Sequence, residues 1–239
     1  MTSAKLQEEI ASFQTLWEGG FRCGYSQERN QKGVETFVKT NLCSPHSTWL
    51  EIGCGGGQWS KAIYPRVAKL YAVDILSATY NKFWEYVGGD ATDKIEYLHV
   101  KDFNLSGVPD NSIDFVFSYD VFCHISLSGQ KEYMKSLKRV MKPGAIAFIM
   151  YADIEKYVMN GGSNLNTIID EYRVTPHDMD KFVSTIVRES DGPSWPGRWY
   201  FVGIENFVKI TEDAGFTIIQ RDIDIDKITP ITMFANWKK

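Results

Sequence analysis

Residues 50–57 of the chain read Leu-Glu-Ile-Gly-Cys-Gly-Gly-Gly, and residues 69–74 read Lys-Leu-Tyr-Ala-Val-Asp. Each stretch contains a short apolar run, which predicts a buried strand. Alternating glycines after the first strand let the backbone turn sharply and approach a ligand without an obstructing Cβ atom; they are Gly53, Gly55 and Gly57. In a doubly wound sheet, Asp74 at the end of the second strand lies beside this loop and can accept hydrogen bonds from ribose hydroxyls. The two stretches therefore predict a site for a ligand with a nucleoside half.

The glycine pattern separates this loop from two other nucleotide sites. A dinucleotide fingerprint, G-x-G-x-x-G, would place its third glycine at position 58, and that residue is Gln58. No G-x-x-x-x-G-K-S/T sequence occurs in the chain, which excludes a P-loop. The pattern present from Glu51 to Gly57 is E-x-G-x-G-x-G. It resembles the first motif of the class I S-adenosylmethionine (SAM) dependent methyltransferases.

The resemblance continues over roughly residues 30–150. Further strands are predicted at 95–99, 113–117 and 145–150, and a helix that opens at Ser128 ends at Lys142-Pro143-Gly144, an arrangement that recurs in this family. The resemblance implies SAM as the cofactor and S-adenosylhomocysteine as its product. It also implies a set of cofactor-binding residues: Glu51, Gly53, Gly55, Gly57, Asp74, Ile75, Asp102, Phe103 and Tyr119.

The family resemblance assigns a part of the cofactor to several of these positions. Asp74 is expected to hold the ribose, and Asp102 the adenine amino group. Ile75 and Phe103 are expected to pack near the adenine ring. Glu51 is expected to contact the methionine end or to order the glycine loop. Asp102 has an alternative explanation as a loop acid that caps a turn.

The predicted elements indicate an α/β fold with a doubly wound, mostly parallel sheet of seven strands, the last of them antiparallel. The closing strands are predicted at 217–225 and 231–237, after a helix at 204–214 that Gly215 ends. We predict four segments: an N-terminal helical lid at 1–45, a SAM-binding Rossmann-like core at 46–150, a substrate cap inserted at 151–203, and the last helix with the closing strands at 204–239.

Length and composition restrict the function further. A chain of 239 residues suits one α/β domain with modest additions. It has no run of about 18 apolar residues that could span a membrane, and its four cysteines lack the C-x-x-C spacing of a zinc site. The net charge of −4 disfavours partners held mainly through phosphates, so no nucleic-acid partner is expected. The N-terminal sequence lacks the basic and apolar stretches of a signal peptide, which favours the cytoplasm.

Two regions outside the core supply candidates for binding the methyl acceptor. The lid contains a glycine- and aromatic-rich loop at 19–25, in which Arg22 could meet a carboxylate or phosphate. A connection as long as 151–203 normally carries structure or function of its own. Trp195 and Trp199 could stack on a sugar ring or hold the cap in place. The acceptor-binding candidates are Arg22, Tyr25, Tyr151, His177, Trp195 and Trp199.

The catalytic candidates lie where the fourth predicted strand ends. Methyl transfer requires an aligned acceptor and, for a hydroxyl or a protonated amine, a base that removes a proton. His124 is the preferred base because an imidazole titrates near neutral pH; the alternative is a histidine bonded to backbone at the start of a helix. Asp120 is expected to hold the amino group of the SAM methionine or to orient His124.

No metal is expected at this site. Some methyltransferases of this family bind Mg²⁺ through acids after the fourth and fifth strands, and Asp120 and Asp153 occupy those places. The second acid or amide that should accompany Asp153 is absent, and a hard cation needs several oxygen ligands. The sequence therefore predicts a methyltransferase that works without a metal.

The sequence favours a small-molecule acceptor. Methylases of this family that act on amino groups of nucleic acids carry a D/N/S-P-P-Y/F/W sequence after the fourth strand, whereas residues 118–121 are Ser-Tyr-Asp-Val. The chain resembles bacterial enzymes that methylate an O or N atom of sugars and other precursors of glycans and natural products. Three alternatives remain: a protein or RNA methyltransferase, a non-catalytic SAM-binding protein, and a nicotinamide oxidoreductase, which Gln58 disfavours.

Overall fold

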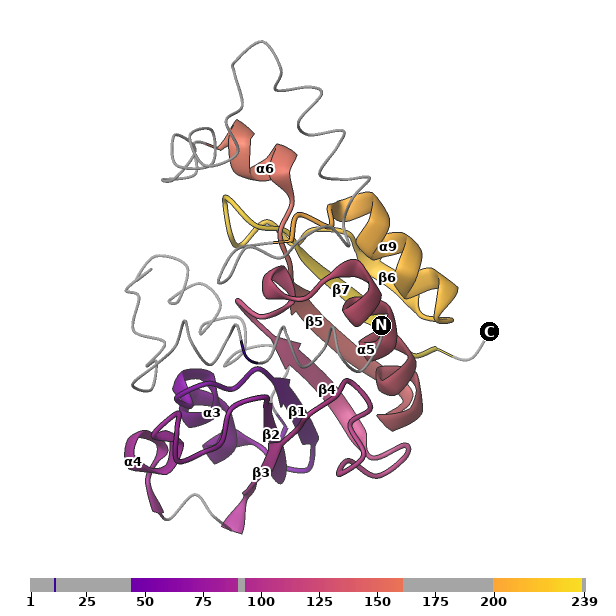
Figure 1. Ribbon diagram of the computed structural model, residues 1–239. Coiled ribbons are helices and arrows are strands. Elements are labelled where there is room, and N and C mark those ends of the chain that lie inside the picture. Colours follow the sequence, from indigo (N-terminus) through magenta and orange to yellow (C-terminus); the bar gives the residue numbers. More distant parts are fainter. Residues whose placement is uncertain (1–10, 12–43, 90–92, 161–199, 238–239) are drawn as a thin grey trace.

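The computed structural model describes residue 11 and residues 44–89, 93–160 and 200–237. The described strands form one twisted sheet with helices on both faces (Figure 1). The strand order is β3-β2-β1-β4-β5-β7-β6. Neighbouring strands from β3 to β5 are parallel, and β7 runs antiparallel to both β5 and β6, as predicted. The strands are β1 (Thr48–Ile52), β2 (Lys69–Asp74), β3 (Ile95–His99), β4 (Ile113–Ser118), β5 (Met141–Met150), β6 (Thr217–Gln220) and β7 (Ile231–Ala235).

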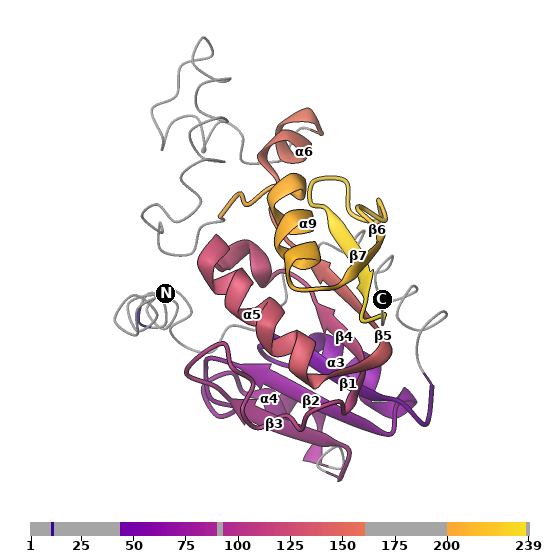
Figure 2. The same cartoon turned by 90° about the vertical axis from the view of Figure 1, so that its right-hand side faces the viewer.

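Helices connect the strands and cover the sheet. They are α3 (Gln58–Ile63), η1 (Tyr64–Arg66), α4 (Phe83–Val87), η3 (Phe122–His124), α5 (Leu127–Val140), α6 (Ile154–Met159) and α9 (Ile204–Asp213). Helices α5 and α9 lie side by side on one face (Figure 2), and α3 and α4 lie on the other. In such a sheet the carboxyl ends of the parallel strands share one edge, where ligands bind.

Alternating side chains of the strands explain how both faces are covered. In β1, Leu50 packs into a cluster with Met134 of α5 and Phe207 of α9. Its neighbour Trp49 points the other way and packs in a second cluster with Ile63 of α3. Because both faces of the central strands are buried, ligand access is confined to the strand ends and their loops.

Two boundaries differ from the sequence prediction. Strand β5 begins at Met141 instead of Ala145, because Pro143 disfavours a helical conformation in the residue before it and the chain extends directly after α5. Both closing strands are shorter than predicted, and β6 ends at Gln220 because Asp222 starts a turn by accepting the backbone N–H of Asp224. The predicted last helix is confirmed as α9.

The predicted helical lid at 1–45 lies outside the described residues, except for helical Ala11 and residues 44 and 45, and so does most of the predicted cap. Within 151–203 the structure describes α6, which the sequence analysis did not predict, and the segment from Tyr200 to Gly203 that leads into α9. Among the described helices, none has the length and apolar character to cross a membrane.

Candidate active site

The glycine-rich loop after β1 lies at the carboxyl edge of the sheet. Gly53 has a φ of 74°, and its N–H donates to the carbonyl oxygen of Val73 at 2.7 Å. A Cβ atom on Gly53 would lie 2.1 Å from the side chain of Val121, which follows β4. Any other residue would be strained in this conformation and would push the two loops apart. The loop therefore packs closely against the chain that leaves β4.

Asp74 lies beside the glycine loop, where the sequence predicts it. Its Oδ2 accepts the N–H of Gly55 at 2.8 Å, and its Oδ1 accepts the N–H of Leu76 at 2.8 Å. Burial raises the pKa of this carboxyl, and the two backbone donors oppose that effect. Asp74 thus orders the loop in this structure, and its contact with a ribose stays a prediction.

Glu51 is buried in β1, directly before the loop, with 1% of its surface exposed. Its Oε2 accepts a hydrogen bond from Ser60 Oγ at 2.5 Å, whereas its Oε1 has no hydrogen-bond partner among the described residues. Desolvation, supported by the nearby Asp74 carboxylate, raises the pKa of Glu51 to about 8. A buried carboxyl with one unbonded oxygen suits a positively charged group of a ligand.

The residues expected at the adenine end have different surroundings. Asp102 accepts the backbone N–H of Asn104 at 3.0 Å with Oδ1 and its side-chain amide at 2.6 Å with Oδ2. Phe103 is buried against Tyr133 of α5, with 4.9 Å between the ring centroids. Ile75 is half-buried after β2. Phe103 therefore has a core contact. Asp102 makes the hydrogen bonds of a turn-capping acid, which is the alternative explanation that the sequence analysis gave for it.

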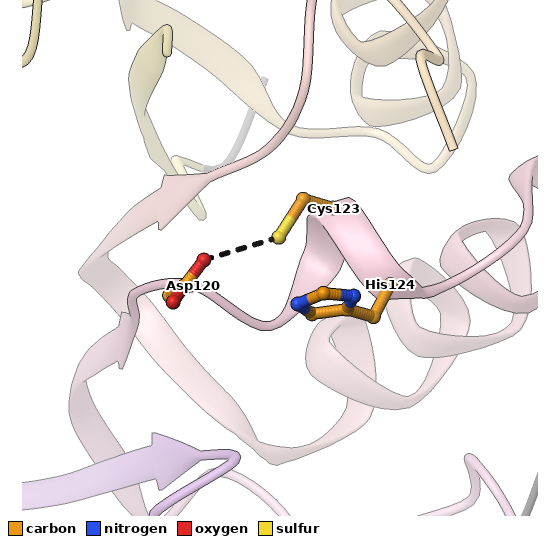
Figure 3. Close-up of side chains that lie close together, drawn as sticks. All are labelled: Asp120, Cys123 and His124. Atoms are coloured by element: carbon orange, nitrogen blue, oxygen red, sulfur yellow. Dashed lines mark hydrogen bonds between the residues drawn. The ribbon is translucent and has the colours of Figure 1, made fainter. Parts of the chain in front are cut away.

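Three polar side chains converge after β4, where Asp120 leads into η3 (Figure 3). Cys123 Sγ donates to Asp120 Oδ1 at 3.5 Å, and one ligand atom from each of Asp120, Cys123 and His124 lies within 4.8 Å of the other two. Asp120 has a φ of 60°, a left-handed conformation that aspartate tolerates. The structure thus brings the two catalytic candidates together and adds Cys123, whose only sequence signal was its position beside His124.

Hydrogen bonds from two other segments hold this turn. The side-chain amide of Gln130 in α5 donates, at 2.8 and 2.9 Å, to the carbonyl oxygens of Phe122 and Ile125. Tyr200, in the segment before α9, donates its N–H to Cys123 O at 2.6 Å. His124, the last residue of η3, is half-buried. Its position therefore depends on the sheet edge, on α5 and on the segment before α9.

Tyr119 directly follows β4 and contacts two distant parts of the chain. Its hydroxyl donates to Asp226 Oδ2 at 2.8 Å, and Asp226 lies in the loop between β6 and β7. Its ring lies edge-on to Trp59, with 5.4 Å between centroids, and Trp59 is in the helix that follows the glycine loop. Burial first, and the Asp226 carboxylate second, raise the pKa of the Tyr119 phenol. Tyr119 thus connects the glycine-loop side of the site with the β6–β7 loop.

The candidates after β5 have structural contacts. Tyr151 is fully buried, its ring stacks on Phe207 at 3.9 Å between centroids, and its hydroxyl pairs with a β7 threonine at 2.9 Å. Asp153 accepts the N–H of Lys156 at 2.7 Å and the N–H of Ile204 at 2.9 Å, so it caps the starts of α6 and α9. Tyr151 therefore has core contacts in this structure, and its contact with an acceptor stays a prediction.

Within the described part of the chain, the side chains that could hold a metal ion are those of Asp120, Cys123 and His124 after β4. Oxygen, sulfur and nitrogen ligands from Asp120, Cys123 and His124 would suit Zn²⁺ better than Mg²⁺. Tetrahedral zinc, with bonds of about 2.0 to 2.3 Å, places its ligand atoms about 3.5 Å apart. The ligand atoms here are spread over up to 4.8 Å, so binding would require the turn to contract. Activity without a metal therefore stays a prediction.

The described residues fit a cofactor with a nucleoside and a cationic end. Gly53 allows close approach, Asp74 supplies a carboxylate beside the glycine loop, and Glu51 has an unbonded buried oxygen. The remaining acceptor-binding candidates lie outside the described residues: Arg22, Tyr25, His177, Trp195 and Trp199.

Comparison with known proteins identifies the domain that carries this site. Residues 50–149 match the protein family described as a methyltransferase domain. The chain is also 29% identical, over 154 residues, to thiocyanate methyltransferase 1 of Brassica oleracea, an alignment that covers 60% of this chain and 67% of the relative. The domain match includes the glycine loop, Asp74, Asp120 and His124.

Solved structures share the fold over nearly the whole chain. The N-methyltransferase NodS from Bradyrhizobium japonicum, in complex with S-adenosylhomocysteine, is 13% identical with a TM-score of 0.56, covering 99% of this chain and 98% of its own. The 1,6-didemethyltoxoflavin-N1-methyltransferase of Burkholderia thailandensis is 12% identical with a TM-score of 0.63, covering 99% and 88%. At these identities the likeness shows the fold alone. Together, the family match and the glycine motif identify residues 50–149 as a methyltransferase domain, within a chain that has the fold of the S-adenosylmethionine-dependent methyltransferases.

Proposed function

We propose that this methyltransferase acts on an O or N atom of a small molecule, such as a sugar or another precursor of glycans or natural products. The observation that carries the proposal is the convergence of Asp120 and His124 at the carboxyl end of β4, next to the glycine loop. The relatives support a small acceptor, because their names state thiocyanate and 1,6-didemethyltoxoflavin. The net charge of −4 is also unfavourable for a polyanionic acceptor.

The chain is proposed to hold the cofactor along the edge formed by β1, β2 and β4. Asp74 accepts the ribose hydroxyls, and Asp102 binds at the adenine end. The carboxylate of Asp120 and the unbonded oxygen of Glu51 attract the ammonium group of the methionine end, and this cation favours release of the proton that the buried Glu51 carboxyl otherwise holds. When bound, SAM supplies a methyl group on a sulfonium sulfur and leaves as neutral S-adenosylhomocysteine.

His124 is proposed to act as the general base. It takes the acceptor's proton on an imidazole nitrogen while the acceptor atom bonds to the methyl carbon. The hydrogen bonds from Gln130 and Tyr200 to carbonyl oxygens of the η3 turn hold the backbone that carries His124. A base and acceptor held in a fixed geometry avoid the entropic cost of alignment in each turnover.

Residues 1–45 and 151–203 are proposed to cover the cofactor and the acceptor, with Arg22, Tyr25, His177, Trp195 and Trp199 as acceptor contacts. One contact supports the proposal that residues 151–203 cover the site. The N–H of Tyr200 donates to Cys123 O, which connects the end of the insertion to the turn that carries His124. An acceptor that contacts the insertion would therefore also affect the position of the base.

The test is transfer of a labelled methyl group from SAM into a desalted cell extract and its small-molecule fraction, with the His124→Ala protein as the control. We expect the label in acid-soluble compounds, where mass spectrometry identifies the product. Label in precipitable protein or RNA would replace the proposal with the macromolecular alternative. Binding of SAM without transfer into any fraction would favour a non-catalytic SAM-binding protein.

A further inference from the structure

The β6–β7 loop, residues 221–230, reaches the active site through Asp226. This residue is 1% exposed, and its Oδ1 accepts the N–H groups of Ile228 at 2.9 Å and Thr229 at 3.3 Å. Its Oδ2 accepts the hydroxyl of Tyr119 at 2.8 Å. Hydrogen bonds from these three donors hold both oxygens of the carboxyl group in place. The loop thus places a buried carboxylate directly behind Tyr119.

A second aspartate in the same loop is arranged in the same way but faces another element. Asp222 Oδ1 accepts the N–H groups of Asp224 at 3.0 Å and Ile231 at 3.2 Å. Its Oδ2 pairs with Lys156 Nζ of α6, which lies next to this loop (Figure 1). Asp222 and Asp226 therefore both shape the loop, and only Asp226 contacts the chain at the end of β4.

The hydrogen bond to Asp226 determines what the Tyr119 hydroxyl can offer a ligand. A phenol has one proton to donate, and here it goes to Asp226, so the remaining lone pairs of the oxygen can only accept. The Tyr119 ring contacts Trp59, which follows the glycine loop, and the next residue in the chain is Asp120. This is the part of the site where the methionine end of SAM is proposed to bind. The sulfonium there is positively charged, whereas the sulfur of S-adenosylhomocysteine is neutral.

We propose that Asp226 is a positioning residue of the cofactor site. Through Tyr119 it presents a hydroxyl oxygen, with a buried carboxylate behind it, to the sulfonium end of SAM. The charged cofactor is thereby favoured over the neutral product, which helps product release after transfer. This inference rests on the proposed function, because it takes the methionine end of SAM to lie beside Tyr119.

The simpler explanation is that the Tyr119–Asp226 hydrogen bond only fastens the loop to the sheet. Such a fastening would change the affinities for SAM and S-adenosylhomocysteine by the same factor. A positioning role changes their ratio, because only one of the two ligands carries the sulfonium charge. The ratio therefore separates the two explanations without relying on activity.

The experiment is calorimetric binding of SAM and of S-adenosylhomocysteine to the wild type, Asp226→Asn, Tyr119→Phe and the double variant. Asparagine keeps an acceptor oxygen for the loop N–H groups, but its amide donates to Tyr119 and turns the phenol proton toward the site. We expect the preference for SAM over S-adenosylhomocysteine to fall by about threefold or more in each single variant. The double variant should lose no more than the single variants, because both interrupt one interaction.

Asp222→Asn is the matched control. It alters the same loop with the same chemical change but leaves the bond to Tyr119 in place, so the ratio of the two affinities should equal that of the wild type. Thermal unfolding of every variant shows whether the loop change has disturbed the fold. Equal loss of affinity for both ligands in Asp226→Asn would overturn the inference, as would additive effects in the double variant. A wild type that binds neither ligand would instead refute the cofactor assignment itself.

Discussion

The buried carboxyl of Glu51 makes the stability of this protein depend on pH in a defined direction. Its pKa is raised from an ordinary value of 4.5 to about 8, first by desolvation and then by the Asp74 carboxylate. Between these two pH values the folded protein holds a proton that the unfolded chain has released. Stability therefore falls as the pH rises from 4.5 to 8, since the folded state binds more protons than the unfolded state.

The magnitude follows from the size of the pKa change. One pKa unit corresponds to about 1.4 kcal/mol, so the whole interval amounts to about 5 kcal/mol, of which about 3 kcal/mol falls between pH 5 and 7.5. Glu51→Gln keeps an oxygen that accepts from Ser60 Oγ and cannot ionise. The Glu51→Gln protein does not undergo this loss. We therefore expect its free energy of unfolding, minus that of the wild type, to increase by about 3 kcal/mol as the pH rises from 5 to 7.5.

Urea unfolding of both proteins at several pH values between 5 and 8 measures this difference, because contributions from other groups cancel between them. Glu155→Gln, an exposed position at the start of α6, is the matched control and should follow the wild type at every pH. Parallel stability curves for Glu51→Gln and the wild type would refute the reasoning, since they would mean that Glu51 ionises in the folded protein at no extra cost.

Three further predictions concern the ligands of the site. Asp74→Ala should weaken SAM binding by about tenfold or more, because it removes a ribose acceptor and the anchor of Gly55; unchanged affinity in calorimetry would remove Asp74 from the cofactor site. His124→Ala should lower the methyl-transfer rate about 10²-fold or more and leave SAM affinity intact, whereas normal turnover would assign His124 a structural role. Activity should survive dialysis against EDTA, and a loss restored by Zn²⁺ in the wild type but not in Cys123→Ser would show a metal site after β4.

Much of the fold could be predicted because the central strands are buried on both faces. Such strands appear in the sequence as short apolar runs, and β3 was predicted with the bounds that the structure shows. The glycine loop and Asp74 were predictable because turn geometry depends on local residues. The start of β5 was missed because the apolar Met141 fits the buried face of the preceding helix as well as it fits a strand.

The site was predictable only in part, because burial and distant contacts are not local properties. Tyr151 follows a strand at the ligand-binding edge, as an acceptor-binding residue would, yet the packing of α9 covers it completely. Asp153 stands where a magnesium ligand could stand, yet its oxygens cap two helices. In each case a neighbour far along the chain determines what the side chain contacts.

The sequence by itself determined the class of fold, the glycine loop with its acid, and the position of Asp120 and His124 after β4, since strand periodicity and turn chemistry act over a few residues. Only the tertiary structure decided that Gln130 holds the η3 turn and that Asp226 bonds to Tyr119 across 107 positions. The contact between Tyr119 and Asp226 depends on the strand order β4-β5-β7-β6, which places the β6–β7 loop near the end of β4. Hydrogen bonds need their atoms within about 3 Å of each other, and for residues this distant in sequence only the assembled sheet provides that proximity.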